Sequence, residues 1–205
     1  MPPNSVPAPV KRLVVASANP GKLLEFRELL ADAPFELTSL GELKLPSPEE
    51  TGATFRENAI LKARHAAASS GLAAIADDSG LEVDALDGAP GVYSARFAGT
   101  QGDDAANNVK LIATLRALEH FAEPWPARYR CVLALMRGAD DAAPLIAEGV
   151  WDGAIVAQPR GRAGFGYDPH FWLPELAVTA AELEPEQKNR LSHRAAAMRA
   201  LRALL

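Results

Sequence analysis

The order of short apolar runs and helix-period segments is the feature that most constrains the fold of this 205-residue chain. In the first half, β-prone runs alternate with segments whose apolar residues repeat at helical spacing, and later two longer strand-like runs follow one another. This order is typical of an α/β fold with a mixed sheet. We expect strands at 12–16, 35–40, 72–76, 128–137 and 145–156, a further extended segment at 81–86, and helices at 20–31, 54–69, 103–121 and after Ser192.

The turn SANPGK, at residues 17–22, lies between the first apolar run and the first helix-period segment. Asn19 is a favourable N-cap, and Pro20 suits the first helical position. Backbone N–H groups at a helix N-terminus, the Asn19 amide and the Lys22 ammonium together suit phosphate oxygens. The spacer and the Gly-Lys-Ser/Thr ending of a Walker A loop are absent. The turn predicts an anion site, and an ordinary connection with a surface lysine is the alternative.

Adjacent carboxylates mark a second candidate site. Asp77 and Asp78 follow the apolar run 72–76, so we expect them at a strand end, and a second acidic pair that includes Glu50 lies upstream. Neighbouring carboxylates repel one another unless a cation or shared protons relieve them, and Mg²⁺ prefers oxygen ligands. The pattern predicts a divalent-ion site, with a solvated acidic turn as the alternative. Lys62 falls on the predicted helix between the acidic pairs and is either a phosphate ligand or a surface lysine.

Two further motifs lie in the C-terminal part of the chain. The loop GFGYD, at 164–168, has two aromatic residues separated by glycine and ends in a carboxylate. Glycine allows close backbone approach to a ligand, and a phenyl face can stack on a purine. Lys188 and the run Ser192, His193 and Arg194 place cations and hydrogen-bond donors at the start of the last helix. A generic aromatic loop and a packed histidine are the alternatives.

Composition excludes several classes of protein. A net charge of -5 offers no basic field for DNA or RNA, so we expect no nucleic-acid partner. No run approaches the ~18 apolar residues of a membrane span, so we expect no membrane partner. The single cysteine, Cys131, lies in an apolar strand-like run, which predicts a buried thiol in a reducing cytoplasm. Residues 1–10 lack signal-peptide features, so we expect a disordered tail before a single domain at 11–205.

Taken together, six ordered blocks resemble the inosine triphosphate pyrophosphatase family, whose bacterial members act on dITP, ITP and XTP. The likeness runs from about Lys11 to the C-terminus. The blocks are SANPGK at 17–22; ETG at 50–52 together with Phe55, ENA at 57–59 and Lys62; ADDSGL at 76–81; GAPG at 88–91 with YSAR at 93–96; GFGYDP at 164–169; and Lys188 with SHR at 192–194. Ala18 stands where many relatives have glycine, and alanine is costly wherever φ is positive.

The resemblance implies a role for each matched residue. The triphosphate would be held by Ser17, Ala18, Asn19, Pro20, Gly21, Lys22 and Lys62. Mg²⁺ would be bound by Glu50 and Asp78 with Asp77 beside them, and Asp78 would act on the attacking water. The base would stack on Phe165, and the other nucleotide contacts would come from Ser79, Gly166, Tyr167, Asp168, Lys188, His193 and Arg194.

The family resemblance also implies an architecture and a reaction. The fold would be an elongated mixed β-sheet flanked by helices, with a nucleotide-binding cleft between two lobes, and the protein would be a cytoplasmic homodimer. The reaction would be hydrolysis between the α- and β-phosphates, which yields a nucleoside monophosphate and pyrophosphate and removes non-standard purine nucleotides from the pool. Hypoxanthine offers an O6 acceptor and an N1–H donor, and Arg194 and His193 can donate to O6.

Two alternative functions remain at this stage. A nucleotide pyrophosphatase of the Maf type would share the cleft and the reaction but prefer pyrimidine or modified nucleotides, and Phe165 and the 192–194 block argue against it. A nucleotide-binding regulatory module would keep the lysines and lose the carboxylates. This chain keeps Glu50, Asp77 and Asp78, which favours an enzyme.

Overall fold

The structure, a computed structural model, describes residues 11–17 and 19–205. Within that part of the chain, seven strands form one sheet in the order β2-β1-β3-β4-β5-β6-β7. The strands are β1 (Lys11–Val15), β2 (Phe35–Ser39), β3 (Ala73–Val83), β4 (Trp125–Met136), β5 (Leu145–Ile155), β6 (Phe171–Leu173) and β7 (Val178–Thr179). The predicted α/β fold with a mixed sheet is confirmed, whereas the predicted N-terminal tail lies outside the described residues.

The type of strand pairing changes once across the sheet, from parallel to antiparallel. β1 pairs in parallel with β2 and with β3, and every later neighbour pairs antiparallel. Parallel neighbours need crossover connections, and the helices α1 (Pro20–Leu29) and α2 (Phe55–Ser70) provide them. Val15 pairs with Ile75. The turn that follows β1 therefore opens beside Asp77, in the middle of β3.

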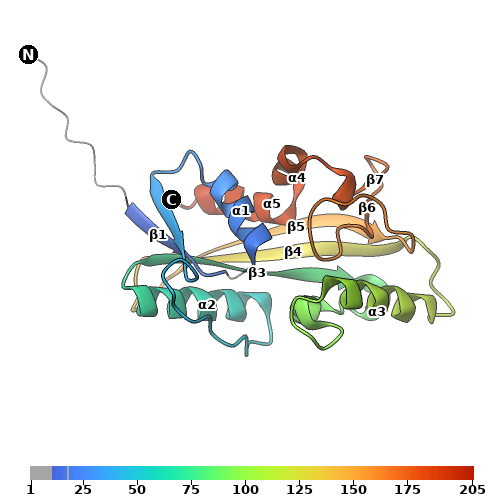
Figure 1. Cartoon of the computed structure of the whole chain (residues 1–205), viewed down its shortest axis with the longest axis horizontal. Helices are drawn as coiled ribbons and strands as arrows, with labels where there is room; N and C mark the ends of the chain where they lie inside the picture. Colours follow the sequence, from blue (N-terminus) through green and yellow to red (C-terminus); the bar gives the residue numbers. More distant parts are fainter. Residues whose placement is uncertain (1–10, 18) are drawn as a thin grey trace, which may run out of the picture.

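Helices cover both faces of the sheet (Figure 1). The helices α1, α4 (Pro185–Leu191) and α5 (His193–Arg202) lie on one face, and α2 and α3 (Asp104–Arg116) lie on the other. Three short 3₁₀ segments complete the described elements: η1 (Asp84–Leu86), η2 (Gly91–Arg96) and η3 (Ala180–Glu182). The long strands β3, β4 and β5 run along the longest axis of the molecule and give it an elongated shape. The division into two lobes stays a prediction.

Helix ends follow the capping residues expected from the sequence. The Asn19 side chain accepts hydrogen bonds from the first backbone N–H groups of α1. Thr54 and Glu57 form a reciprocal capping box at the start of α2, and Gly71 ends this helix with a left-handed φ of 70°. Ser192 accepts a hydrogen bond at the start of α5. The capping residues therefore predicted the starts of these three helices correctly.

One predicted boundary in the site region is wrong. The expected strand 72–76 does not end before the paired carboxylates, because β3 continues through them and pairs with β4 as far as Val83. Gly80 allows this continuation, since a Cβ there would clash with the backbone oxygen of Gly91 and the Ser94 hydroxyl. Asp77 and Asp78 therefore lie in the middle of a paired strand rather than at its end.

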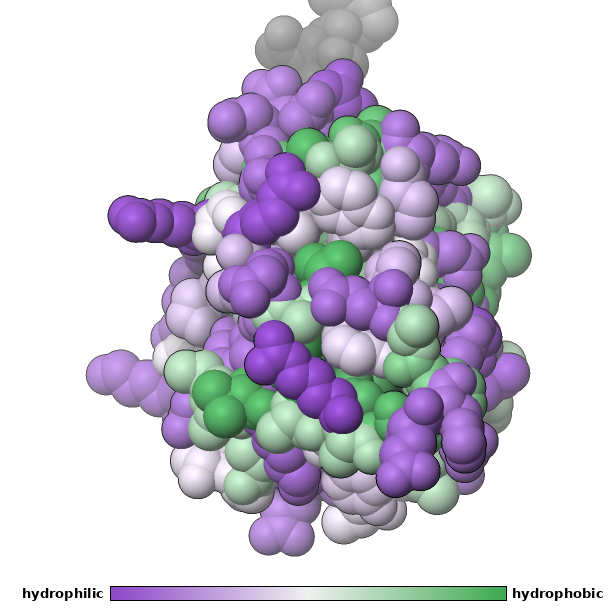
Figure 2. Space-filling model, turned by 90° about the vertical axis from the view of Figure 1, so that its right-hand side faces the viewer, coloured by the Kyte–Doolittle hydropathy of each residue, from purple (hydrophilic) through white to green (hydrophobic). Residues whose placement is uncertain are grey.

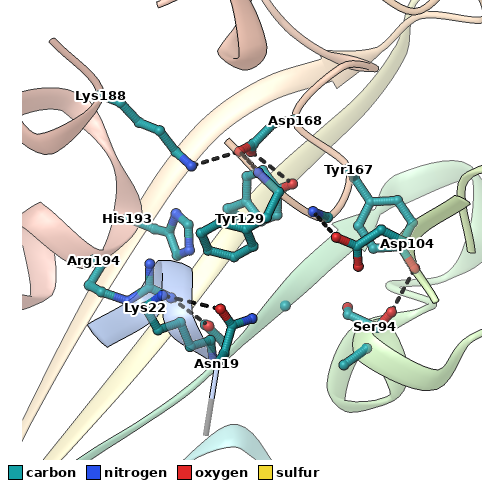
Figure 3. Close-up of a pocket in the computed structure, with 15 residues that line it drawn as sticks. Asn19, Lys22, Ser94, Asp104, Tyr129, Tyr167, Asp168, Lys188, His193 and Arg194 are labelled. Carbon is teal, nitrogen blue, oxygen red and sulfur yellow. Dashed lines mark hydrogen bonds and ion pairs between the residues drawn. The ribbon is translucent and has the colours of Figure 1, made fainter. Parts of the chain in front are cut away.

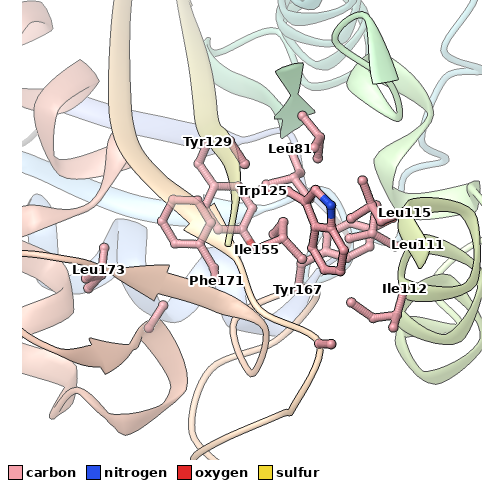
Figure 4. Close-up of a cluster of buried hydrophobic side chains, with 14 of the residues drawn as sticks. Leu81, Leu111, Ile112, Leu115, Trp125, Tyr129, Ile155, Tyr167, Phe171 and Leu173 are labelled. Atoms are coloured by element: carbon pink, nitrogen blue, oxygen red, sulfur yellow. The ribbon is translucent and has the colours of Figure 1, made fainter. Parts of the chain in front are cut away.

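Buried apolar residues form three clusters among the described residues. One lies between the sheet and α2, and a second lies between the sheet and α1 with α5. The third, shown in Figure 4, packs α3 against the far ends of β3, β4 and β5 and includes Trp125, Tyr129 and Tyr167. The helix predicted at 103–121 ends at Arg116, and the chain then turns so that Trp125 enters this cluster. Both tyrosines also border the pocket described below.

The contact between α5 and β5 depends on a glycine, which gives a testable prediction. A Cβ at Gly149 would clash with the backbone oxygen of His193 and the backbone nitrogen of Ala197. Gly149→Ala should therefore destabilise the protein by about 1–3 kcal/mol, the usual cost of overpacking. Chemical denaturation measures the loss. Gly138→Ala is the matched control, because nothing lies within 4 Å of its Cβ position. Equal stability of both variants would contradict this packing.

The surface shows a mixture of residue types. The end of the molecule seen in Figure 2 carries small hydrophobic areas separated by hydrophilic side chains. Exposed apolar residues include Leu176, Leu191 and Val150, which are 49%, 43% and 43% exposed. Among the described residues, the helices are all too short or too polar to cross a membrane.

Candidate active site

Two adjoining pockets open around the turn after β1. They share Asn19, Lys22, Ser79 and Ala95. We call the first the aromatic pocket; its other lining residues are Gly80, Ser94, Asp104, Tyr129, Phe165, Gly166, Tyr167, Asp168, Lys188, His193 and Arg194. We call the second the charged pocket; its other lining residues are Ser17, Ser47, Pro48, Glu49, Glu50, Thr51, Lys62, Asp78, Val92, Arg96 and Gln101.

The turn at 17–22 is held in shape by its own side chains. Asn19 Oδ1 accepts hydrogen bonds from Gly21 N at 2.8 Å and from Lys22 N at 3.2 Å, and Asn19 N donates to Ser17 Oγ. This geometry places the N-terminal end of α1 and the Lys22 ammonium at the junction of the two pockets. Partial and full positive charge therefore meet where the pockets join, which suits an anion.

The adjacent carboxylates point to opposite faces of the sheet. Successive side chains of an extended strand alternate between faces, and β3 is extended at this point. Asp77 points towards α1 and α5, where it contacts Lys22 and Arg194. Asp78 points towards α2, where it contacts Lys62. The expected repulsion between neighbours is thus relieved by separate cations on the two faces.

Asp77 is enclosed by donors and does not line either pocket. Its Oδ2 accepts hydrogen bonds from Lys22 Nζ at 2.9 Å, Arg194 Nη2 at 3.0 Å and Ser79 Oγ at 3.0 Å. The residue is 1% exposed, and its Oδ1 has no hydrogen-bond partner among the described residues. Asp77 therefore positions two cations from behind the pockets.

A chain of alternating charges continues from Arg194. Its Nη1 donates to Glu25 on α1, and Lys188 Nζ lies 3.2 Å from the second oxygen of Glu25. Lys188 also donates to Asp168 Oδ2 at 2.6 Å. All four side chains are at least nine-tenths buried. This chain connects α1, α4, α5 and the 164–168 loop, so it fixes the floor of the aromatic pocket.

On the other face, Lys62 joins the two acidic residues of the charged pocket. Its Nζ lies 2.7 Å from Asp78 Oδ1 and 2.9 Å from Glu50 Oε1. Asn58 Nδ2 donates to Asp78 Oδ2 at 3.2 Å, and Arg96 Nη1 donates to Glu50 Oε2 at 2.9 Å. Both carboxylates are therefore held towards one point by groups from α2 and η2.

Burial and neighbouring charges give the three carboxylates different pKa values. Burial would raise the pKa of Asp77, but attraction to cations, Lys22 first, outweighs it and holds the pKa far below its ordinary value. Burial raises the pKa of Asp78 more than attraction to Lys62 lowers it. Burial would also raise the pKa of Glu50, but Lys62 reverses the direction and lowers it. Asp78 is thus the most basic of the three relative to its ordinary value.

The 164–168 loop is fixed from three sides. Asp168 Oδ2 accepts a hydrogen bond from Phe165 N, and Gly164 has a φ of 77° with no room for a Cβ beside this carboxylate. Gly166 N donates to Asp104 Oδ2 at 2.6 Å, at the start of α3. The Phe165 ring lies 4.6 Å from Lys188 Nζ and closes over Gly21, where a Cβ would approach the ring within 2.7 Å. The loop therefore presents an aromatic face beside the turn.

A stacked pair of rings forms the back of the aromatic pocket (Figure 3). His193 lies parallel to Tyr129 with ring centroids 4.7 Å apart, and the Tyr129 hydroxyl donates to Asp168 Oδ1 at 3.3 Å. Burial, assisted by the neighbouring Arg194, lowers the pKa of His193 well below its ordinary value, so the imidazole is neutral. His193 Nδ1 has no hydrogen-bond partner among the described residues. A buried polar atom of this kind needs a partner from a ligand or water.

Most residues predicted from the sequence come together here. Those that line a pocket are Ser17, Asn19, Lys22, Glu50, Lys62, Asp78, Ser79, Phe165, Gly166, Tyr167, Asp168, Lys188, His193 and Arg194. Pro20 and Gly21 form the first turn of α1 without lining a pocket, and Ala18 lies outside the described residues. Arg194 borders the aromatic pocket, but most of its donors already bind Asp77, Glu25 and Ser79.

Five residues whose side chains hold the site in place were not predicted from the sequence. Asn58 and Arg96 lie inside matched blocks, so the blocks themselves were a usable signal. Glu25 follows the turn lysine by three positions on α1, a spacing that places both on one helix face. Tyr129 and Asp104 reach the pocket through the pairing of β4 and the docking of α3. Nothing local in the sequence marks these two.

Known proteins resemble this chain in sequence and in overall fold. The chain belongs to the Ham1 family, which it matches over residues 13–204. It is 54% identical over 191 residues to a dITP/XTP pyrophosphatase of Thioalkalivibrio sulfidiphilus, covering 93% of this chain and 96% of that protein. It is 56% identical over 197 residues to a dITP/XTP pyrophosphatase of Burkholderia pseudomallei, covering 95% and 93%. The solved structure of a HAM1 protein from Coxiella burnetii superposes with a TM-score of 0.86 at 48% identity, covering 95% and 98%.

Proposed function

We propose that this protein hydrolyses the purine nucleoside triphosphates dITP, ITP and XTP to the nucleoside monophosphate and pyrophosphate. One observation carries the proposal: an aromatic pocket and a charged pocket adjoin and share Lys22 and Asn19. A nucleotide has the matching form, a flat base joined through a sugar to a chain of phosphates. The dITP/XTP pyrophosphatases to which the chain is more than half identical support this substrate class.

In the charged pocket, this chain's own residues hold the phosphates and move a proton. The Asn19 side-chain amide and the Lys22 ammonium bind phosphate oxygens at the pocket junction, and Lys62 binds phosphate oxygens beside Asp78. Asp78 accepts a proton from the water that attacks the α-phosphorus, and its raised pKa suits that role. The bond between the α-phosphorus and the bridging oxygen breaks, and pyrophosphate leaves with the bonding electron pair.

The donor set fits Mg²⁺. Glu50 and Asp78 are hard oxygen donors that both contact the Lys62 ammonium within 2.9 Å, so their carboxylates converge. No group of three His, Cys, Asp or Glu side chains suited to a metal occurs within residues 11–17 and 19–205. Two carboxylates suffice for Mg²⁺, because this ion usually takes its other ligands from substrate phosphates and water. When bound, Mg²⁺ would offset negative charge on the phosphates.

In the aromatic pocket, Phe165 provides a stacking face and His193 reads the base. A neutral imidazole carries one N–H donor and one acceptor; His193 lines this pocket, and its Nδ1 has no hydrogen-bond partner among the described residues. A 6-oxopurine offers O6 as an acceptor, whereas adenine has an amino group in that place. A site that depends on such a hydrogen bond rejects the analogue that lacks it.

Substrate selection is tested by pyrophosphate release. The purified protein should release pyrophosphate from dITP, ITP and XTP with kcat/KM at least about 10²-fold above that for ATP, since a lost buried hydrogen bond is worth ~1–3 kcal/mol and the site uses more than one contact. Guanine shares O6 and N1–H with hypoxanthine, so a lower rate on GTP would come from its 2-amino group. Detection of pyrophosphate rather than phosphate identifies the bond that breaks. Equal rates on all purine triphosphates, or release of orthophosphate, would contradict the proposal.

Metal dependence gives a second prediction. Activity on dITP should vanish in excess EDTA and return when Mg²⁺ is added beyond the chelator, because both acidic ligands otherwise face the substrate's negative charge. Calorimetry with Glu50→Gln should show weaker Mg²⁺ binding in the presence of a non-hydrolysable dITP analogue. Glu28→Gln, on the exposed side of α1, is the control. Full activity in EDTA would reject the metal requirement.

The same proposal covers assembly, domain organisation and location. We place residues 11–205 in one domain of a cytoplasmic homodimer, on the strength of the family resemblance and of the one continuous sheet. The single cysteine, Cys131, is buried and free, as suits a reducing compartment. Light scattering coupled to size-exclusion chromatography should give twice the chain mass of 21.8 kDa. A monomer at micromolar concentration would contradict the dimer without affecting the assigned reaction.

A further inference from the structure

The charged pocket contains one cation that the proposed reaction has not used. Arg96 lies at the end of η2, and its side chain is 27% exposed. Its guanidinium carbon lies 5.2 Å from the centroid of the Tyr93 ring, which supports the side chain. One nitrogen, Nη1, donates to Glu50 Oε2. Arg96 is therefore a partly exposed cation whose side chain is held in place by Glu50 and Tyr93.

The guanidinium has donors left over. Arginine carries five N–H donors in a planar fork, and the bond from Nη1 to Glu50 is the only hydrogen bond that the Arg96 guanidinium makes to the described residues. Nε and Nη2 have no hydrogen-bond partner among those residues, and Arg96 lines the charged pocket. A planar fork with free donors fits two oxygens of a phosphate group, a contact that a lysine ammonium makes only as a point charge.

Charge balance supports a phosphate role. Among the residues that line this pocket, three cations, Lys22, Lys62 and Arg96, face three carboxylates. The lining is thus neutral when all six groups are charged. A triphosphate brings several further negative charges, so a pocket without Arg96 would be net negative before the substrate entered. At separations of a few ångströms such repulsion is large in a partly buried site.

Position along the cleft identifies the part of the substrate that Arg96 meets. Lys22 and Asn19 border both pockets, whereas Arg96 borders the charged pocket alone. With the base in the aromatic pocket, Arg96 lies beyond the junction residues along the phosphate chain. We infer that Arg96 binds the two terminal phosphates and stabilises the pyrophosphate as it leaves. This inference rests on the proposed function and adds a substrate-binding residue to it.

The test compares Arg96→Gln with the wild-type protein in product inhibition. At saturating Mg²⁺, the inhibition constant for inorganic pyrophosphate should rise about 10–100-fold in Arg96→Gln, since hydrogen bonds to charged groups are worth ~1.5–3 kcal/mol. The inhibition constant for dIMP, which has the base and no terminal phosphates, should change less than about 3-fold, because no contact to it is lost. Arg96→Lys should lie between the two proteins for pyrophosphate.

The control variant is Arg56→Gln, an exposed arginine on α2 that lines neither pocket. It should match the wild type in both constants, and thermal unfolding should show that each variant is folded. An unchanged pyrophosphate constant in Arg96→Gln, or equal losses for pyrophosphate and dIMP, would overturn the inference, the latter because Arg96 would then act only by holding Glu50. A wild-type protein that does not hydrolyse dITP would instead reject the proposed function.

Discussion

Asp78→Asn should lower kcat for dITP by about 10²–10⁴-fold, the usual contribution of a positioned acid–base group. Asparagine keeps the shape of the side chain and one oxygen that can accept from Lys62, but its NH2 group replaces the oxygen that accepts from Asn58, and it cannot accept a proton from water. Asp78 borders the charged pocket and is 5% exposed, so loss of its carboxylate changes the side of β3 on which the substrate is proposed to bind. Single-turnover kinetics at saturating dITP and Mg²⁺ measures the chemical step.

Asp77→Asn is the matched control for that variant. It removes a negative charge of the same type one residue away, but on the opposite face of β3 and behind both pockets. Its main effect should be on stability, because Lys22 and Arg194 lose their shared carboxylate. Near-normal kcat in a folded Asp78→Asn protein, or the larger kcat loss in Asp77→Asn with unchanged stability, would contradict the assignment of roles.

The elements of the fold were predictable where local chemistry decides them. Asn19, Thr54 and Ser192 carry capping side chains, and each marks a helix start that the structure confirms. The course of β3 was not predictable, because two charged residues inside a strand oppose the usual apolar pattern. Their compensation comes from cations on α1, α2 and α5, which are distant in sequence. Tertiary ion pairs therefore overrode a local signal.

The candidate site, like the fold, was predictable from the sequence in one part and not in another. Residues on contiguous motifs, such as the 17–22 turn and the 164–168 loop, could be selected from the sequence and do meet in space. Which of them touch could not be predicted, because the contacts depend on sheet register and helix docking. Glu25 shows this most clearly: it links Lys188 and Arg194 across 163 and 169 positions of the chain. Glu25 lies outside every matched block.

Arg194→Ala should have the largest effect on stability, about 3–5 kcal/mol, the usual result of removing one partner of a buried ion pair. The guanidinium is 1% exposed and holds Asp77 and Glu25, which would otherwise remain charged and buried. The sequence predicted that Arg194 reads the base; in the structure, most of its donors serve the two carboxylates and Ser79. Loss of stability should therefore accompany any loss of selectivity.

Urea unfolding and the ratio of kcat/KM for ITP and ATP separate the two roles. Arg199→Ala is the control on the same helix, since Arg199 is exposed and its loss leaves no buried charge. Arg194→Lys keeps the charge but not the fork, so it should fold with an intermediate stability and allows activity to be measured if the alanine variant is unfolded. We expect the lysine variant to retain a preference for ITP, because His193 keeps its place at the pocket. Wild-type stability together with equal rates on ITP and ATP in Arg194→Lys would show instead that the guanidinium reads the base and that the buried ion pairs contribute little to the fold.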